Sequence, residues 1–382
     1  MPDFELTRAQ DDLRRHTREI RDTQVVPFLE RRGMDHALSA DELKQLLRMT
    51  LPIGYPGAVV AKEDGGAGLD YVSLGIVIEE LAPVFGFLAA HVVPRQIAML
   101  GTPEQKRRYL VPLLAVDRLS TTAITEPDVG SDAGAIRMTA RRAGDRYVLN
   151  GMKTWLTLGN IAETATVLVS TDPAAGSRGL SRIIVDLDHR RLRSSAIGTL
   201  GDRLIPFAEV TFEDYEVPVE NRLGQEGEGF RLTLRAIQAS RASMATHAVG
   251  IAQAAVDAAI AYAKQRTQFG RPIGGFQLVQ GMLADMIAET EAARLLSYRA
   301  WAMMDHGREC SRESSIAKLY ATEAAVRVTS KAIQIHGASG VSDRHPVGRY
   351  FRDARMLTFP DGTSEVHRLL IGRSALGIDA FR

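Results

Sequence analysis

The spacing of apolar residues changes twice along the chain, and these two changes limit the fold more than any other feature. In the first third, segments such as residues 41–49 and 72–81 place apolar residues three and four positions apart, which is typical of amphipathic helices. Between about Ser120 and Phe230, short runs of β-prone residues replace this pattern, and long helical patterns return after Phe230. This order predicts a mainly α protein with a central β-barrel or β-sandwich, divided into residues 1–119, 120–230 and 231–382.

The strongest turn signal of the middle region is Asn150-Gly151, which lies between the β-prone residues 147–149 and 153–157. Asn-Gly favours the tight turn of a β-hairpin, because both turn positions take positive φ. A hairpin is therefore expected at this point. Alternate residues of a strand share one face, so Trp155 and Thr157 are expected to point the same way and to form a platform for a flat heteroaromatic ring.

Composition argues against several classes of protein. The 382 residues carry a formal net charge of +1, whereas proteins that bind nucleic acids concentrate positive charge. The single cysteine, Cys310, excludes an internal disulfide framework and has no His or Cys at metal-ligand spacing. The N-terminus lacks the apolar core of a signal peptide, and no apolar run is long enough to cross a bilayer. We expect a cytoplasmic protein with no metal site and no nucleic-acid or membrane partner.

Three further segments carry residues suited to binding, although each pattern alone more often belongs to ordinary structure than to a binding site. Residues 125–132 (TEPDVGSD) predict a turn cluster that offers amides and hydroxyls to a polar ligand. Residues 266–272 (RTQFGRP) end a long predicted helix, and basic residues with a glycine are normal there. Residues 334–340 (QIHGASG) form a glycine-rich turn whose amides suit a phosphate, and His336 within it is expected to be structural.

Taken together and in order, these segments resemble a known family. Thr125-Glu126-Pro127 with Gly130-Ser131-Asp132 is followed by Lys153-x-Trp155-x-Thr157, Arg266-x-Gln268-Phe269-Gly270, Gln334-x-His336-Gly337, and Arg352-Asp353-Ala354 with Asp361-Gly362-Thr363-Ser364. Residues 62–68 (KEDGGAG) and 101–110 (GTPEQKRRYL) add to the match. Their order and spacing resemble the acyl-CoA dehydrogenase family over nearly the whole chain.

The resemblance implies a fold, a cofactor and an assembly. The fold would comprise an N-terminal helical domain, a middle β-domain and a C-terminal four-helix bundle, with FAD between the last two. The residues expected to contact FAD are Ile124, Thr125, Ser131, Trp155, Thr157, Thr363 and Glu365, and those expected to contact the FAD of a neighbouring subunit in a homodimer or homotetramer are Arg266, Gln268, Phe269, Gln277, Gln334, Gly337 and Ala338. The thioester channel would be lined by Ser131, Arg241 and Gly362.

The largest departure from the family pattern is Asp361, where most relatives have the Glu that removes the α-proton of the substrate. Ser240 occupies the alternative base position and cannot serve, so Asp361 is the candidate catalytic base. An alternative is that Asp361 only caps the helix that follows, because Asp is a preferred N-cap. Smaller departures are Val129, Ala338, and Gln238, which replaces an Asp that helps some relatives to hold the pantetheine arm.

The resemblance implies α,β-dehydrogenation of an acyl thioester carried by CoA or an acyl-carrier protein. Asp361 would remove the α-proton, the β-hydride would pass to flavin N5, and an electron-transfer flavoprotein would accept the electrons. An alternative is a flavin oxidase acting on a nitroalkane, whose α-proton is more acidic than that of a thioester. Such members of the superfamily also carry Asp at this position. A third possibility is a catalytically silent flavoprotein that serves as a binding module. Residues expected near the acyl group are Phe85, Phe87, Leu88 and His91.

Overall fold

The N-terminal region is helical. A computed structural model describes residues 5–85 and 90–381, so Phe87 and Leu88 lie outside the described residues, as does the side chain of Phe85. The helices are α1 (Arg8–Ile20), α2 (Val26–Arg32), α3 (Ala40–Met49), α4 (Tyr71–Phe85), α5 (Val92–Leu100), α6 (Pro103–Gln105) and α7 (Val111–Leu114), with a π-helical turn at Arg21–Val25. Thr102 caps α6 as its sequence context predicts, because its hydroxyl accepts from the Gln105 N–H and Pro103 occupies the first turn.

The middle region is one mixed sheet in two halves. The first half comprises β6 (Arg193–Ile197), β7 (Phe207–Pro218), β3 (Arg146–Thr157) and β2 (Thr139–Ala143), in that order, and the second comprises β4 (Thr164–Ser170), β5 (Leu180–Asp186) and β8 (Arg222–Leu223). β1 (Ser120–Ala123) pairs with β4 in parallel. A single residue pair, Thr139 with Ser170, joins the halves.

The predicted Asn150-Gly151 hairpin turn is wrong. β3 runs unbroken through both residues, and the hairpin turn is formed by Gly144-Asp145, because Ala143 pairs with Arg146. The Asn150 amide instead bonds Asp214 of β7 at a bulge, donating to its carboxylate at 3.0 Å and accepting from its N–H at 2.9 Å. Gly151 is needed there for close packing, since an added Cβ would lie 2.9 Å from the Met138 Cα.

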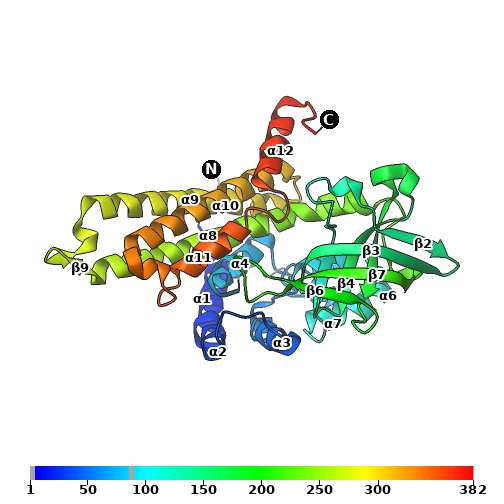
Figure 1. Ribbon diagram of the computed structural model, residues 1–382, viewed down its shortest axis with the longest axis horizontal. Helices are drawn as coiled ribbons and strands as arrows, with labels where there is room; N and C mark the ends of the chain where they lie inside the picture. The colour runs from blue at the N-terminus through cyan, green and yellow to red at the C-terminus, as the bar shows by residue number, and fades with distance from the viewer. Residues whose placement is uncertain (1–4, 86–89, 382) are drawn as a thin grey trace.

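Long helices return in the C-terminal region, as expected. They are α8 (Gly229–Gln265), α9 (Gln277–Asp305), α10 (Ser311–His336), α11 (Val347–Met356) and α12 (Ser364–Leu376), and a small ribbon of β9 (Thr267–Gln268) and β10 (Arg271–Pro272) follows α8. Figure 1 shows α8 extending from the β-domain to this ribbon at the opposite end of the molecule. The helical, β and helical order is therefore confirmed, whereas the exact domain limits of 119 and 230 stay predictions.

One helix bears on the expectation that no segment reaches membrane-spanning length. α8 is 37 residues long and is apolar enough, by length and composition alone, to cross a bilayer. That expectation was therefore wrong on length, because residues 242–256 of α8 contain no Asp, Glu, Lys or Arg. However, 67% of its most apolar window is buried inside the protein, as in the core helix of a helical bundle.

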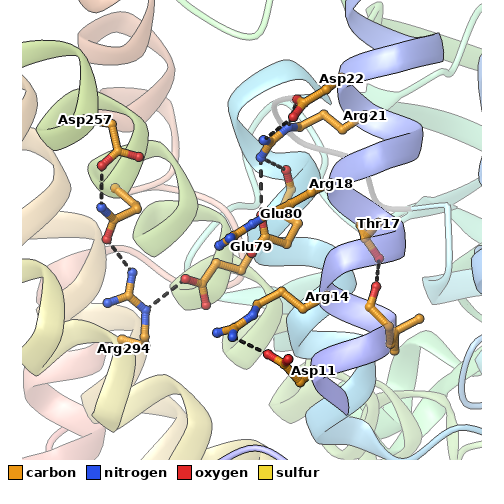
Figure 2. A network of polar contacts seen from close by, with 12 residues as sticks. Asp11, Arg14, Thr17, Arg18, Arg21, Asp22, Glu79, Glu80, Asp257 and Arg294 are labelled. Atoms are coloured by element: carbon orange, nitrogen blue, oxygen red, sulfur yellow. Dashed lines mark hydrogen bonds and ion pairs between the residues drawn. The ribbon is translucent and has the colours of Figure 1, made fainter. Parts of the chain in front are cut away.

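An ionic network around the buried Glu80 joins the N-terminal helices to the C-terminal bundle. Figure 2 shows Glu80 of α4 between Arg18 and Arg21, whose nitrogens lie 2.7 and 3.3 Å from its carboxylate, and Glu79 facing Arg294 of α9. The Glu79 carboxylate accepts from Arg294 at 2.9 Å and from the Tyr298 hydroxyl at 2.9 Å. Each buried carboxylate thus has at least one basic partner, and the network fixes α1, α4 and α9 relative to one another.

Candidate active site

The first group of predicted site residues lies on the β-domain. The Thr154 N–H donates to the Thr125 carbonyl at 2.9 Å, which brings the loop after β1 alongside the bulged end of β3. Trp155 occupies that bulge with φ 59 and leaves 53% of its surface exposed. A left-handed backbone at a bulky residue costs about 1–2 kcal/mol. An exposed indole held in a strained conformation is suited to stacking on a ligand ring.

A buried ion pair, which sequence reasoning did not single out, holds this platform. Lys153 Nζ donates to the Glu126 carboxylate at 2.8 Å and to the Ile124 carbonyl at 2.8 Å. The same carboxylate accepts the N–H groups of Arg137 and Met138 at 2.8 and 2.9 Å. Burial lowers the pKa of Lys153 to about 8, although Glu126 opposes the shift. Glu126 and Lys153 therefore fix the loop that carries Thr125. Thr157 is half-buried.

The second group surrounds Asp361, which lies in the turn between α11 and α12 with φ 58. Lys318 of α10 is completely buried and donates to the carbonyls of Thr358 at 2.8 Å and Gly362 at 2.7 Å. Arg241 of α8 donates from Nε to the Asp361 carbonyl at 3.1 Å. Two buried cations from two helices therefore hold the main chain on both sides of the candidate base.

The carboxylate of Asp361 is left free by this arrangement. It makes no hydrogen bond or ion pair within the described residues, and neither does the Asp361 N–H. Burial raises the pKa of Asp361 to about 6, against the opposing charges of Arg241, Lys318 and Arg95. A carboxyl group with a pKa of about 6 is ionised at neutral pH and is more basic than an ordinary Asp.

The alternative in which Asp361 caps the following helix is wrong. α12 begins at Ser364, and its N-cap is Thr363, whose hydroxyl accepts from the Val366 N–H at 3.3 Å. Asp361 lies two positions earlier, outside the cap, because the turn needs both Asp361 and Gly362 before the helix begins. Gly362 has φ 109 and packs against buried His367, where an added Cβ would lie 3.2 Å from Nε2. Glu365 is exposed on the first turn of α12.

Helix α5 connects the two groups. Gln96 accepts from the Thr166 hydroxyl of β4 at 2.9 Å, and its neighbour Arg95 donates to the Ala236 carbonyl of α8 at 2.7 Å. His91, at the start of α5, is buried between the Tyr55 hydroxyl and the Ser243 hydroxyl, each 3.1 Å from one ring nitrogen. Burial lowers the pKa of His91 to about 3, so it is a neutral residue of the interior.

The third group lies at the other end of the bundle. Tyr262 stacks on His336 with ring centroids 4.2 Å apart, and its hydroxyl donates to Ser339 at 3.3 Å, so the ends of α8 and α10 lie together. Every predicted contact residue of this group is exposed: Arg266, Gln268, Phe269, Gln277, Gln334, Gly337 and Ala338. The α8 segment from Arg241 to Gln265 spans roughly 36 Å at about 1.5 Å per residue, so this group cannot reach Asp361 of its own chain.

Two remaining predictions concern single residues. Ser131 is exposed in the loop after β1, and no described contact ties it to Asp361. Cys310 is buried, and its thiol faces the Gln238 side chain at 3.7 Å. Burial raises the pKa of Cys310 to about 11, which makes the thiol unreactive. No group of metal-binding side chains occurs among residues 5–85 and 90–381.

Lys318 and Arg95 are site residues that sequence reasoning missed. Both positions could have been recognised from the sequence pattern. Lys318 shares a helix face with the small residues Ala321 and Ala325, and Arg95 interrupts the apolar run VVPRQIAML. A lone cation within an apolar helical pattern indicates burial, and burial of a cation indicates a specific partner.

Comparisons with known proteins agree with this architecture. Sequence profiles of the acyl-CoA dehydrogenase N-terminal, middle and C-terminal domains match residues 7–117, 121–215 and 227–376. A short-chain specific acyl-CoA dehydrogenase of Clostridium acetobutylicum is 37% identical over 97% of this chain and 98% of its own. Subunit CarC of the caffeyl-CoA reductase–Etf complex of Acetobacterium woodii is 37% identical over 86% of this chain and 88% of its own.

Solved structures show the same fold. The structure of PigA with FAD and proline superposes with a TM-score of 0.92 at 26% identity, over 98% of this chain and 99% of that one. All three domain profiles and both full-length relatives thus point to one assignment. The chain belongs to the acyl-CoA dehydrogenase family of flavin-dependent oxidoreductases, which act on CH–CH groups.

Proposed function

We propose that this chain is an FAD-dependent dehydrogenase of an acyl thioester and that Asp361 removes the α-proton. One observation carries the proposal: Arg241 and Lys318 bond the carbonyls around Asp361 and leave its carboxylate free. A general base must be fixed in position and yet have an unoccupied lone pair. The turn of residues 358–362 that carries Asp361, here called the base turn, meets both requirements. A pKa of about 6 keeps Asp361 ionised at neutral pH.

The free N–H of Asp361 provides a second function at the same turn. It has no acceptor within the described residues, whereas the neighbouring carbonyls are bonded by cations. A preorganised N–H donor stabilises negative charge that develops on a carbonyl oxygen. We assign this N–H to the thioester carbonyl, where it would increase the acidity of the α-proton that Asp361 removes.

The residues of the β-domain fit a flavin. Trp155 presents an exposed, conformationally restrained indole, and the Glu126–Lys153 pair fixes the adjacent loop of Ile124 and Thr125. Bound FAD would accept the β-hydrogen of the substrate as a hydride. Thr157, Ser131, Thr363 and Glu365 are assigned as further contacts to FAD, and Gly362 and Arg241, with Ser131, to the thioester channel, following the family resemblance.

The third group would serve the FAD of a neighbouring subunit. Phe269 is 94% exposed at the tip of the β9–β10 ribbon, and all of its predicted companions are exposed. An exposed aromatic residue at the end of the bundle is suited to a subunit contact. We propose a homodimer or homotetramer in which Arg266, Gln268, Phe269, Gln277 and residues 334–338 complete the site of the partner.

CoA and an acyl-carrier protein both fit as the acyl carrier, and an electron-transfer flavoprotein fits as the electron acceptor. The latter assignment agrees with the Etf complex named for the Acetobacterium woodii relative. A cytoplasmic location stays a prediction from the sequence.

A second candidate function, oxidation of a small nitroalkane, is favoured by Asp361 alone. Asp is one methylene shorter than Glu, which withdraws the carboxylate by about 1 Å or more. A nitroalkane α-proton is more acidic than a thioester α-proton, so a less extended base suffices for its removal.

Anaerobic bleaching of the flavin distinguishes the candidates. The purified holoprotein is mixed with acyl-CoAs, acyl-carrier thioesters and nitroalkanes, and flavin absorbance is followed. Bleaching by a thioester is expected and identifies its carrier. Bleaching by nitroalkanes alone would move the chain to the oxidase reaction, and bleaching by neither would contradict both candidates.

A further inference from the structure

Asp353, the acidic residue of the Arg-Asp-Ala motif, lies outside the base turn and yet is buried. It occupies the last turn of α11 with 4% of its surface exposed. Its carboxylate accepts the Asp202 N–H at 2.8 Å and the Arg349 guanidinium at 3.3 Å. Asp202 belongs to the loop of residues 198–206 between β6 and β7. One buried side chain of the C-terminal bundle therefore bonds the main chain of the β-domain.

The main chains of this loop and of α11 are also in direct contact. Gly201 approaches α11 so closely that an added Cβ would lie 2.4 Å from the Arg352 carbonyl carbon and 2.7 Å from the Asp353 nitrogen. Glycine is required at such an approach, because any side chain would push the loop away from the helix. Asp202 follows with φ 51, a conformation that the surrounding structure must hold in place. The hydrogen bond from Asp202 to Asp353 supplies that restraint.

On the β-domain side, the loop leads directly to the exposed Trp155. β7 follows the loop and begins at Phe207, which pairs with Thr157 of β3. The Pro206 carbonyl, at the end of the loop, accepts the Leu158 N–H at 2.7 Å. The rings of Phe207 and Trp155 lie edge to face, with centroids 6.4 Å apart. The position of the loop therefore determines the position of the indole that is proposed to contact the flavin.

On the bundle side, α11 leads directly to Asp361. The helix ends at Met356, and the Thr358 carbonyl that follows accepts Lys318 Nζ at 2.8 Å. The Thr358 hydroxyl donates to the Arg355 carbonyl at 2.9 Å, so a hydrogen bond as well as the chain joins the base turn to α11. A displacement of α11 would therefore displace the base turn.

A small cavity makes this contact depend on its hydrogen bonds. The cavity has a volume of about 20 Å³ and is lined by residues that include Asp202, Leu204, Arg349 and Asp353. Atoms that line a void lack packing partners on that side. The separation of the loop and α11 is therefore set by the hydrogen bonds of Asp353 and the approach of Gly201 more than by close packing.

We propose that Asp353 is a positioning residue, whose hydrogen bond to the Asp202 N–H fixes the distance between the flavin contact Trp155 and the base Asp361. Removal of a proton and a hydride from neighbouring carbons requires the base and the flavin to be held within about 0.5 Å of the productive geometry. Asp353 acts through the loop and α11. This inference rests on the proposed function, because it assumes FAD beside Trp155 and a base at Asp361.

Three variants distinguish positioning from stability. Asp353→Ala removes both contacts of the carboxylate, whereas Asp353→Asn loses the charge that faces Arg349 but keeps an oxygen for the Asp202 N–H. Gly201→Ala keeps Asp353 and separates the loop from α11, so the test stands even if Asp353→Ala folds poorly. Glu80→Gln is the control, since Glu80 is likewise buried and paired with arginines but joins α1 to α4.

Flavin reduction is followed anaerobically by stopped flow in each holoprotein. The probe is the thioester that reduces the parent flavin fastest, and rates are expressed per bound flavin. The dependence of the rate on thioester concentration gives the limiting rate and the dissociation constant of the thioester. Denaturant unfolding gives the stability of each variant.

The limiting rate should fall by about 10- to 100-fold in Asp353→Ala and in Gly201→Ala, because a displacement of about 1 Å at the reacting groups has that effect. The thioester dissociation constant should be unchanged in both. The pH at which the rate levels off should also be unchanged, because the three cations that act on Asp361 stay in place. Asp353→Asn and Glu80→Gln should lower stability and keep the parent rate.

Three results would overturn the inference, and they differ in what they imply for the proposed function. If either alanine variant reduces its flavin at the parent rate, the contact only stabilises the fold, although the dehydrogenase function stands. If Asp353→Asn is as slow as Asp353→Ala, the charge rather than the hydrogen bond is responsible, and the dehydrogenase function again stands. If no thioester reduces the parent flavin, the inference and the proposed function fail together.

Discussion

Charged side chains are buried in two regions of the molecule and are organised in opposite ways. In the interdomain network of Figure 2, Glu79 and Glu80 each face at least one arginine at hydrogen-bond distance. Around Asp361, in contrast, Lys318 and Arg241 bond carbonyl oxygens. Within residues 5–85 and 90–381, Arg95 has no carboxylate partner and the Asp361 carboxylate has no hydrogen bond or ion pair. The first region satisfies its charges within the chain, and the second keeps bonding capacity for a ligand.

This difference distinguishes side chains that stabilise the fold from side chains that are available for binding and catalysis. A paired network fixes helices relative to one another, and removal of one member leaves its partner unsatisfied. A region with unused donors and a free carboxylate is less favourable for folding but has groups available for binding and proton transfer. Substitutions in the two regions should therefore affect different measurements.

The largest contrast is expected for Lys318→Met, which removes the clamp from the base turn. We expect flavin reduction to slow by about 10- to 100-fold, because a misplacement of about 1 Å at a reacting group has that effect. Loss of the positive charge should also raise the pKa of Asp361 above about 6 and shift the pH profile of reduction upward. Lys331→Met on the same helix is the control, since among the described residues Lys331 pairs only with Asp285 and Glu289. An unchanged rate and pH profile would remove Lys318 from the site.

Glu80→Gln should instead lower the stability of the fold and leave the rate of flavin reduction unchanged. It keeps the side-chain shape but removes the charge between Arg18 and Arg21, and we expect the free energy of unfolding to fall by roughly 2 kcal/mol. The rate of flavin reduction per bound flavin should be unchanged. Denaturant unfolding measures the first quantity, and Asp22→Asn at the exposed edge of the network is the control, with an effect below about 0.5 kcal/mol. A slower reduction in Glu80→Gln would mean that the two regions are coupled.

The remaining effect concerns the pH dependence of stability. Asp361 has a model-peptide pKa of 3.8 and a folded pKa of about 6, so the unfolded chain releases its proton at lower pH. The contribution of Asp361 to stability is therefore fully present below pH 3.8 and is lost as pH rises through about 6. We expect a loss of about 3 kcal/mol across this window, from a shift of about 2 pH units at about 1.4 kcal/mol each, and this loss should be absent from Asp361→Asn. Identical slopes in both proteins would contradict the raised pKa.

Sequence patterns predicted the large elements because those elements depend on local periodicity. The return of helices near Phe230 follows from the spacing of apolar residues. The Asn150-Gly151 hairpin failed because a tertiary contact, the pairing of Asn150 with Asp214, replaced the local turn preference.

At the candidate site, too, contacts between distant parts of the sequence limited what could be predicted. Motifs and the family resemblance identified Asp361, Trp155 and Arg241, but not Lys318 and Arg95, because these two cations come from helices far from Asp361 in the sequence. Their common role depends on a three-dimensional contact that periodicity does not encode. Thr363 as the helix cap was likewise decided by the geometry of the turn, in which Asp361 takes a positive φ.

The most direct test of Asp361 as the base is the rate of flavin reduction by a reactive thioester in the parent protein and in Asp361→Asn, measured by stopped flow from about pH 5 to about pH 8. The parent rate should rise with pH and level off above about 6, as Asp361 ionises. Asp361→Asn should retain FAD, reduce it about 100- to 10,000-fold more slowly, and show no such rise. If Asp361→Asn keeps the parent rate and pH profile, Asp361 is not the base.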